Sequence, residues 1–325
     1  MTAERQSRAT QSRAIKRRAT ISIIGAGRMG TALALALSAR GYRIEAVVAK
    51  RRSHARRAAE LTGTQPLILT SAQLDQLPNS DILFITTPDD TIESVAAQLA
   101  ATLTLRIAKS ERKIHQRTAL HASGALSSNA LHNLRDVGYA TGSLHPLVSV
   151  SDPVQGAEHL RSAFFCIEGE SAAQRVARSL VRSLGAQSFS IKTKDKALYH
   201  AAAVMASGHV TALFDIATQM LARCGLNERR ARRVLLPLLK STLENLYASD
   251  PTHALTGTFA RADSATVRKH LAALRSSEMR DALAAYTLLG LRSLRLTKAA
   301  GASSEALKEI KKLLAKDRIT DLEKT

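Results

Sequence analysis

The stretch ISIIGAGRMG, residues 21–30, decides the fold of the N-terminal half of the chain. Its short β-rich apolar run ends in a GxGxxG pattern, and the small apolar residues from Thr31 to Ala39 are typical of a helix. A second strand, RIEAVVAK at 43–50, follows at once. This strand–turn–helix–strand order is the context in which GxGxxG indicates a dinucleotide-binding turn, with a merely structural glycine turn as the alternative.

Each glycine of the pattern has a separate physical task. Gly25 permits the tight turn, Gly27 lets the backbone approach a pyrophosphate, and Gly30 lets the helix pack closely on the strand. The first backbone N–H groups of the helix, near Arg28 and Met29, then face the anion.

The end of the second strand predicts which nucleotide is bound. An NAD site normally has an acidic residue there, but Glu45 falls at the beginning of the strand. The strand ends instead in Lys50, followed by Arg51, Arg52 and Ser53, whose positive charges and hydroxyl suit the 2′-phosphate of NADP. Solvated charges at the start of the next helix are the alternative. NADP is therefore expected, with NAD less favoured.

Strand and helix signals alternate as far as residue 193. We expect Thr87, Pro88 and Asp89, at the tip of one of these strands, to border the nicotinamide ribose. The alternation predicts an α/β fold with a parallel, doubly wound sheet whose ligands lie at the carboxyl ends of the strands. The strand-like segments are 81–90, 117–126, 138–150, 162–170 and 186–193.

Long helical patterns replace the strand signals from Lys194 onward, so the second domain is expected to be all-α. We predict a disordered basic tail at 1–19, a Rossmann domain at 20–193 and a helical substrate and dimerisation domain at 194–325, with a cleft between the two domains. The expected helices are 196–223, 228–248, 264–275, 278–298 and 304–315.

Charge and composition restrict the partners. The net charge of +20 favours phosphate-bearing ligands, but aromatic residues make up only 3% with no Trp, and much of the excess charge lies in the tail, so nucleic-acid binding is disfavoured. A transit peptide would have a composition similar to that of the tail. The longest greasy run, 201–214, is interrupted by His209, so no membrane span is expected.

The two cysteines, Cys166 and Cys224, lie far apart, and the ten histidines form no close ligand pattern. Neither a disulfide framework nor a structural metal is therefore expected. A reducing cytoplasm fits this cysteine usage best.

From Gly25 to about Leu274 the chain resembles Rossmann-like proteins that carry a C-terminal domain of unknown function 2520. More distantly it is similar to the 6-phosphogluconate and β-hydroxyacid dehydrogenases, pyrroline-5-carboxylate reductases and prephenate dehydrogenases. That resemblance implies a helical domain that forms a homodimer and a substrate held beside the nicotinamide. The segments that carry the first resemblance are GAGRMGTALA, TTPDDTI, LHASGALSS, GSLHPLVSVSD, DKALYHAAAVMASGHVTALFD, LLPLLKSTLEN and ALTGTFARADSATVRKHL.

Lys196 in KALYH is the first candidate catalytic residue. On a helix, Tyr199 and His200 share its face, and Ser207 and Thr211 continue a polar stripe. The resemblance to β-hydroxyacid dehydrogenases implies a catalytic lysine at such a helix start, although they have asparagine where this chain has Tyr199 and His200. A solvated lysine is the alternative.

His145 in the loop GSLHPLVS is the second candidate, with a side chain whose pKa suits proton transfer near neutral pH. The resemblance to prephenate dehydrogenases implies that a histidine in such a loop engages the substrate. His121, Ser123 and Gly124, at the mouth of the preceding strand, are expected to line the same pocket. A purely local hydrogen bond is the alternative for either histidine.

The loop ALTGTFARAD adds Thr256 and Arg261 as candidate substrate-binding residues. Arg261 suits a carboxylate or phosphate, and a salt bridge with Asp263 is the alternative.

These features favour an NADP-dependent oxidoreductase that acts on a small anionic substrate at the cleft between the domains, with Lys196 or His145 handling the proton. The alternative is a non-catalytic nucleotide-binding regulatory or scaffold protein, because a Rossmann turn reports binding rather than chemistry.

Overall fold

The computed structural model describes residues 18–107, 117–277 and 279–322, so most of the predicted tail at 1–19 lies outside the described residues. The chain divides into two compact units, one ending at Val204 and one beginning at Met205. The division falls later than the predicted boundary near residue 193, because Lys196 and Tyr199 make their hydrogen bonds to the first unit.

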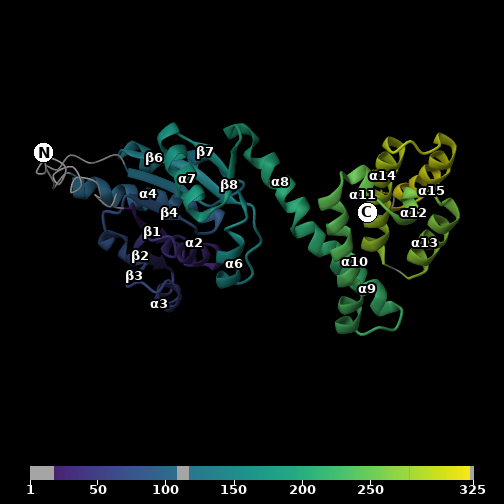
Figure 1. Cartoon of the computed structure of the whole chain (residues 1–325), viewed down its shortest axis with the longest axis horizontal. Coiled ribbons are helices and arrows are strands. Elements are labelled where there is room, and N and C mark those ends of the chain that lie inside the picture. The colour runs from purple at the N-terminus through teal and green to yellow at the C-terminus, as the bar shows by residue number, and fades with distance from the viewer. Residues whose placement is uncertain (1–17, 108–116, 278, 323–325) are drawn as a thin grey trace, which may run out of the picture. The chain divides into compact units, whose positions relative to one another are not determined.

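The first unit is built on one eight-stranded sheet of order β3-β2-β1-β4-β5-β6-β7-β8 (Figure 1). All neighbouring strands pair in parallel except β6 and β7, which are antiparallel. The expected parallel sheet is therefore confirmed for β1 to β6, whereas β7 and β8 run in the opposite direction. Strand β3, which has four residues and lies at an edge of the sheet, was outside the predicted strands. The strands are β1 Thr20–Ile24, β2 Arg43–Ala49, β3 Leu67–Thr70, β4 Ile82–Ile85, β5 Arg117–His121, β6 Tyr139–Pro146, β7 Phe164–Gly169 and β8 Gln187–Ser190.

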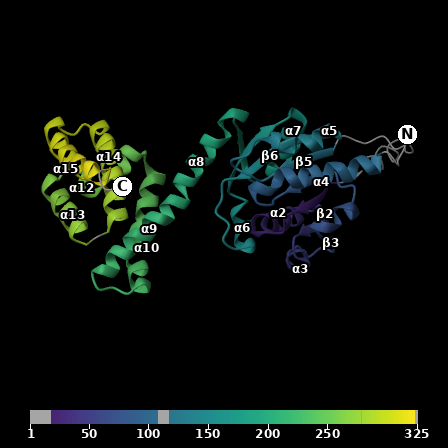
Figure 2. The same cartoon turned by 180° about the vertical axis from the view of Figure 1, so that it is seen from behind.

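Helices cover both faces of this sheet. One apolar core joins the sheet to α2 (Arg28–Ser38), α3 (Arg52–Leu61), α6 (Pro153–His159) and α7 (Ser171–Leu184). A second core lies under α4 (Asp89–Ile107) and α5 (His132–Asp136), on the other side (Figure 2). Short 3-10 turns complete the unit: η1 Ser71–Gln76, η2 Ser128–Leu131 and η3 Thr193–Asp195, which leads into α8, Lys196–Ala206. The doubly wound architecture is therefore confirmed.

The second unit is helical in its described residues. Its elements are α9 Gly208–Arg223, α10 Glu228–Ala248, α11 Pro251–Ala254, α12 Gly257–Ala260, α13 Ser264–Ser276, α14 Arg280–Ala299 and α15 Ser304–Leu322. Its core lies between α13, α14 and α15 around Val267, Leu271 and Ile310. The helix predicted at 196–223 is two helices, because Ser207 leaves helical geometry at φ −127° and ψ −74°.

Within the described residues, one helical stretch, Thr193–Arg223, is long and apolar enough to cross a membrane by length and composition alone. Helices of soluble proteins pass the same test, so this observation is weak evidence. Few residues of its most apolar window are buried within the described chain.

Candidate active site

The β1–α2 turn has the geometry that a dinucleotide turn requires. Gly25 has φ +113°, and a Cβ there would lie 2.6 Å from the backbone of Thr86. A Cβ on Gly30 would collide with the carbonyl oxygen of Gly25. Glycine is therefore needed at both positions, for a left-handed turn and for close helix packing.

Gly27 is different, because a Cβ there would meet no atom within 4 Å in the described structure. It is the N-cap of α2, in extended geometry, and no described side chain caps the helix. Helix geometry leaves the amides of Arg28, Met29 and Gly30 without an intrahelical acceptor. An open cradle below free N–H groups fits a pyrophosphate.

A cavity of about 590 Å³ extends from this turn to the ends of β2 and β4. Thr87 Oγ1 is buried there and has no hydrogen-bond partner among the described residues, as expected for a group that a ligand satisfies. Pro88 also lines the cavity. Asp89, by contrast, accepts a hydrogen bond from Ser123 Oγ at 2.8 Å and holds the next loop in place.

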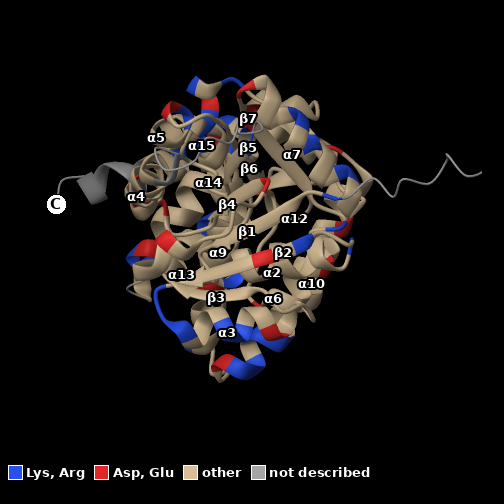
Figure 3. Ribbon diagram, turned by 90° about the vertical axis from the view of Figure 1, so that its left-hand side faces the viewer, with Lys and Arg blue, Asp and Glu red and all other residues tan. Residues whose placement is uncertain are grey.

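Lys50, directly after β2, and His54, in the first turn of α3, contribute to the wall of the cavity. Arg51, Arg52 and Ser53 are exposed at the start of α3, where Lys and Arg positions gather (Figure 3), and do not line the cavity. The carboxylate of Glu45 accepts a hydrogen bond from Ser80 Oγ at 2.7 Å and pairs with Arg43, so it is engaged away from the strand end.

Sheet register brings a second group of polar residues together. The pairings place His121, Ser143 and Glu168 in one row across β5, β6 and β7. His145, Cys166 and Phe189 form the next row across β6, β7 and β8. Because paired residues point to the same face of a sheet, these rows form one surface.

Lys196, at the start of α8, lies against the first row. Its side chain is buried, and Nζ donates to Ser143 Oγ at 2.9 Å and to the Ser123 carbonyl at 3.0 Å. Nζ also lies 5.6 Å from the centroid of the Tyr199 ring. Burial lowers the pKa of Lys196, and Cys166 and Glu168 raise it in part. The alternative of a solvated lysine is therefore ruled out.

Tyr199 and His200 lie against the second row. His145 Nδ1 shares a hydrogen bond of 2.7 Å with the Tyr199 hydroxyl, and the His200 ring meets His145 edge to face at 5.5 Å. Burial, followed by the charge of Lys196, lowers the pKa of His145 to about 3, so the imidazole is neutral at pH 7. Burial also raises the pKa of Tyr199, so its hydroxyl keeps its proton.

Gly124 allows these two imidazoles to converge. A Cβ there would lie 2.8 Å from His145 Nε2 and would collide with His200 Nδ1. His200 Nδ1 is buried without a hydrogen-bond partner in the described chain. Gly124 therefore leaves the space that the two rings occupy, since a Cβ there would force at least one ring to move.

Both ring nitrogens of His121 already have hydrogen-bond partners, so neither is free for a substrate. Its Nε2 bonds to the Ser127 carbonyl at 3.0 Å, and its Nδ1 accepts from the Ser123 amide at 3.2 Å. Ser123 Oγ likewise accepts from the amides of Ala125 and Leu126. The prediction that His121 and Ser123 line the pocket is corrected: their side chains build the loop that presents Gly124 and the Ser123 carbonyl.

We predict that acid weakens the fold through His121. Burial lowers its pKa from 6.5 to about 4, so between these values the unfolded chain binds more protons than the folded one. The free energy of unfolding should therefore rise with pH across that window and lose up to about 3 kcal/mol as pH falls through it. Urea unfolding of the wild type and His121→Gln at pH 4–7 measures this contribution. His132→Gln, at a half-exposed histidine, is the control and should keep the wild-type slope.

Three predicted residues belong to the second unit. Ser207 precedes α9, Thr256 precedes α12, and Arg261 ends α12. Asp263 caps α13 by accepting hydrogen bonds from Thr266, and among the described residues it forms no salt bridge with Arg261. These three residues therefore stay candidates by sequence position.

Ser143 and Glu168 were absent from the predicted site, although each left a signal. Ser143 lies two positions before His145 on one strand, and period-two alternation puts both on one face. Glu168 is the single charge in the apolar run FFCIEG. Neither signal shows which elements pack on that face of the sheet. The sequence therefore could not identify α8 as the helix that packs there.

Comparison of the chain with known protein families gives two matches. Residues 20–107 match the family described as NADP oxidoreductase, coenzyme F420-dependent, and residues 163–293 match the domain of unknown function 2520. The N-terminal match is thus to an oxidoreductase family and the C-terminal match to the domain of unknown function 2520, each over less than half of the chain. A search of curated proteins found no match.

Solved structures share the fold at low identity. A protein from Thermotoga maritima is 20% identical with a TM-score of 0.65, covering 87% of this chain and 100% of its own. A proposed NADP oxidoreductase from Bacteroides fragilis is 20% identical with a TM-score of 0.67, covering 86% and 99%. Pyrroline carboxylate reductase from Plasmodium falciparum, with NADP bound, is 14% identical with a TM-score of 0.51, covering 86% and 99%.

Proposed function

We propose that the protein is an NADP-dependent oxidoreductase that transfers hydride to or from a small anionic substrate. One observation carries the proposal: buried Lys196 lies at the same sheet whose β1–α2 turn offers an uncapped glycine cradle. The glycine turn and Lys196 thus both lie at the carboxyl ends of parallel strands in this mostly parallel sheet, where such proteins bind ligands.

The cofactor site would use the residues of that cradle. The amides following Gly27 would hold the pyrophosphate, and the buried hydroxyl of Thr87 would meet the ribose side of the cavity. A bound nicotinamide dinucleotide supplies a donor or acceptor of hydride. Lys50 and His54 would face the 2′-phosphate of NADP.

Lys196 is the proposed proton donor and acceptor. An ammonium has three N–H groups, and Ser143 and the Ser123 carbonyl take two of them, which leaves one for an oxygen or nitrogen of the substrate. Burial lowers the pKa of Lys196, which makes its ammonium a better proton donor than that of a solvated lysine. His145, neutral and held by Tyr199, would orient the substrate through Nε2.

A ligand screen tests the proposal directly. Thermal shifts with NADPH, NADH and a panel of oxo and imino acids should show stabilisation by NADPH, since a ligand of the native state raises apparent stability. Oxidation of NADPH by one member of the panel would support an enzyme. Binding of NADPH without turnover across the panel would favour the regulatory alternative.

The preference for NADP is expected to depend on Lys50. Replacing it with glutamate removes a charge-assisted hydrogen bond worth about 1.5–3 kcal/mol, so NADPH affinity should fall about 10–100-fold, and NADH affinity much less. Titration calorimetry at fixed salt measures both. Arg57→Glu, exposed on α3 and not part of the cavity wall, should change neither affinity. Equal losses for both nucleotides would contradict the assignment.

We also propose a homodimer through the helical unit. Its α10 exposes large apolar side chains, among them Leu236 at 53% and Leu243 at 46%, which lie seven positions apart on one face of the helix. Burying such a surface against a second copy is favourable. Sedimentation should give a dimer at micromolar concentration, and Leu236→Asp with Leu243→Asp should give a monomer. Leu105→Asp, exposed on α4, should remain a dimer, and a wild-type monomer would reject the proposal.

A further inference from the structure

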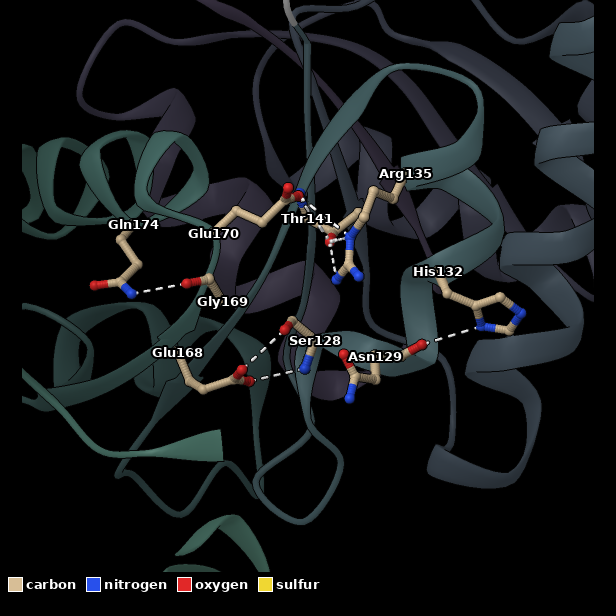
Figure 4. A network of polar contacts seen from close by, with 9 residues as sticks. All are labelled: Ser128, Asn129, His132, Arg135, Thr141, Glu168, Gly169, Glu170 and Gln174. Carbon is tan, nitrogen blue, oxygen red and sulfur yellow. Dashed lines mark hydrogen bonds and ion pairs between the residues drawn. The ribbon is translucent and has the colours of Figure 1, made fainter. Parts of the chain in front are cut away.

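Glu168 on β7 is a buried carboxylate that neither the fold nor the proposed reaction yet explains. Its residue is 3% exposed, and it accepts three hydrogen bonds. The Ser128 amide donates at 2.7 Å, Ser128 Oγ at 2.8 Å and Thr193 Oγ1 at 2.8 Å. Figure 4 shows the carboxylate pointing at Ser128. Carboxylates are rarely buried unless they are paired or fully hydrogen-bonded, so this position has a specific use.

The hydrogen bonds join the two segments that meet at Lys196. Ser128 begins η2, directly after the loop that carries the Ser123 carbonyl. Thr193 begins η3, the turn that leads into α8 and places Lys196 three residues later. The Glu168 side chain therefore connects the loop that carries the Ser123 carbonyl to the start of the helix that carries Lys196.

The same carboxylate also lies beside the ammonium. Glu168 and Ser143 are directly paired on neighbouring antiparallel strands, which puts their Cβ atoms about 5 Å apart. Nζ of Lys196 donates to that same Ser143 hydroxyl. The other titratable groups that act on Lys196 or face it are Asp89 from α4, His121 from β5, His145 from β6, Cys166 from β7 and Tyr199 from α8.

We propose that Glu168 is a positioning residue for Lys196: it ties the start of α8 to the loop after β5 and supplies the negative charge that stabilises the buried ammonium. The inference rests on the proposed role of Lys196 in the reaction. Its test, however, observes the lysine itself and needs no substrate.

The charge is tested by NMR of the full chain labelled with ¹⁵N-lysine, with Lys196→Arg identifying the Nζ resonance. Glu168→Gln keeps an oxygen acceptor and removes the charge, so the pKa of Lys196 should fall by about one unit, a tenfold change in the unprotonated fraction. Glu170→Gln is the matched control. Glu170 belongs to the same polar network but is 41% exposed and pairs with Arg135, so its loss should leave the pKa of Lys196 unchanged.

The tether is tested separately by Thr193→Val, which keeps the charge of Glu168 and removes the hydrogen bond to the turn before α8. Amide hydrogen exchange from Lys196 to Tyr199 should quicken about tenfold, whereas Thr193→Ser should exchange like the wild type. This pair of variants tests the hydrogen bond between Thr193 and Glu168 even if Glu168→Gln does not fold.

An unchanged pKa of Lys196 in folded Glu168→Gln, or equal exchange in Thr193→Val and Thr193→Ser, would overturn the inference. Dinucleotide binding is measured in every variant and should stay at the wild-type value, because the β1–α2 turn is not altered. Failure of the proposed function would appear instead as a wild-type chain that binds no dinucleotide, whatever the lysine measurements show.

Discussion

Replacing Lys196 with methionine is expected to lower turnover by a factor of about 10²–10⁴, the usual contribution of a positioned acid or base. Methionine retains an unbranched apolar side chain for the buried site but has no proton to give. Dinucleotide affinity should stay within about twofold, because the glycine cradle lies on β1 and α2. Steady-state rates with the substrate found in the screen, together with calorimetry for NADPH, measure the two quantities.

Folding of this variant is favoured by the hydrogen bond that survives. Ser143 Oγ donates to the Ser123 carbonyl at 3.2 Å, so neither group loses its last partner when Nζ is removed. Lys194→Met, at an exposed lysine of the same segment, is the control and should turn over at the wild-type rate. Wild-type turnover by Lys196→Met would show that the proton is handled elsewhere.

Replacing Gly27 with valine is expected to weaken NADPH binding at least about 100-fold, which corresponds to roughly 3 kcal/mol. The added side chain would occupy the open space above the first amides of α2, where the phosphates must approach the backbone. The backbone at Gly27 has φ −78° and ψ −171°, which valine adopts readily. The loss should therefore come without loss of stability, measured by calorimetry and urea unfolding.

Ala101→Val, which adds similar bulk at an exposed position on α4, should bind NADPH like the wild type. If Gly27→Val kept full affinity, the turn would be a structural feature only. Gly27→Val and Lys196→Met together also distinguish the enzyme from the regulatory alternative. Both an enzyme and a regulatory protein need Gly27 free of a side chain, whereas only the enzyme needs Lys196 for activity.

Local pattern was sufficient for much of this molecule. The GxGxxG turn, its two flanking strands and the long helices of the second unit are all readable, because periodicity and glycine report conformation over a few residues. The helix predicted at 228–248 is α10 with the same bounds. The antiparallel direction of β7 was not readable, because strand direction depends on pairing with residues far along the chain. The break at Ser207 was missed although the Ser207–Gly208 pair is a local signal for it.

The amino-acid sequence by itself determined a Rossmann turn, its free helix N-terminus and the candidates Lys196 and His145. Only the tertiary structure decided the surroundings of these side chains. It buried Lys196 against Ser143 and Ser123, made His145 a neutral partner of Tyr199, and turned His121 into a scaffold for its own loop. The physical reason is that burial and hydrogen-bond partners set the charge of a side chain. Those partners come from strands that are adjacent in the sheet but distant in the sequence.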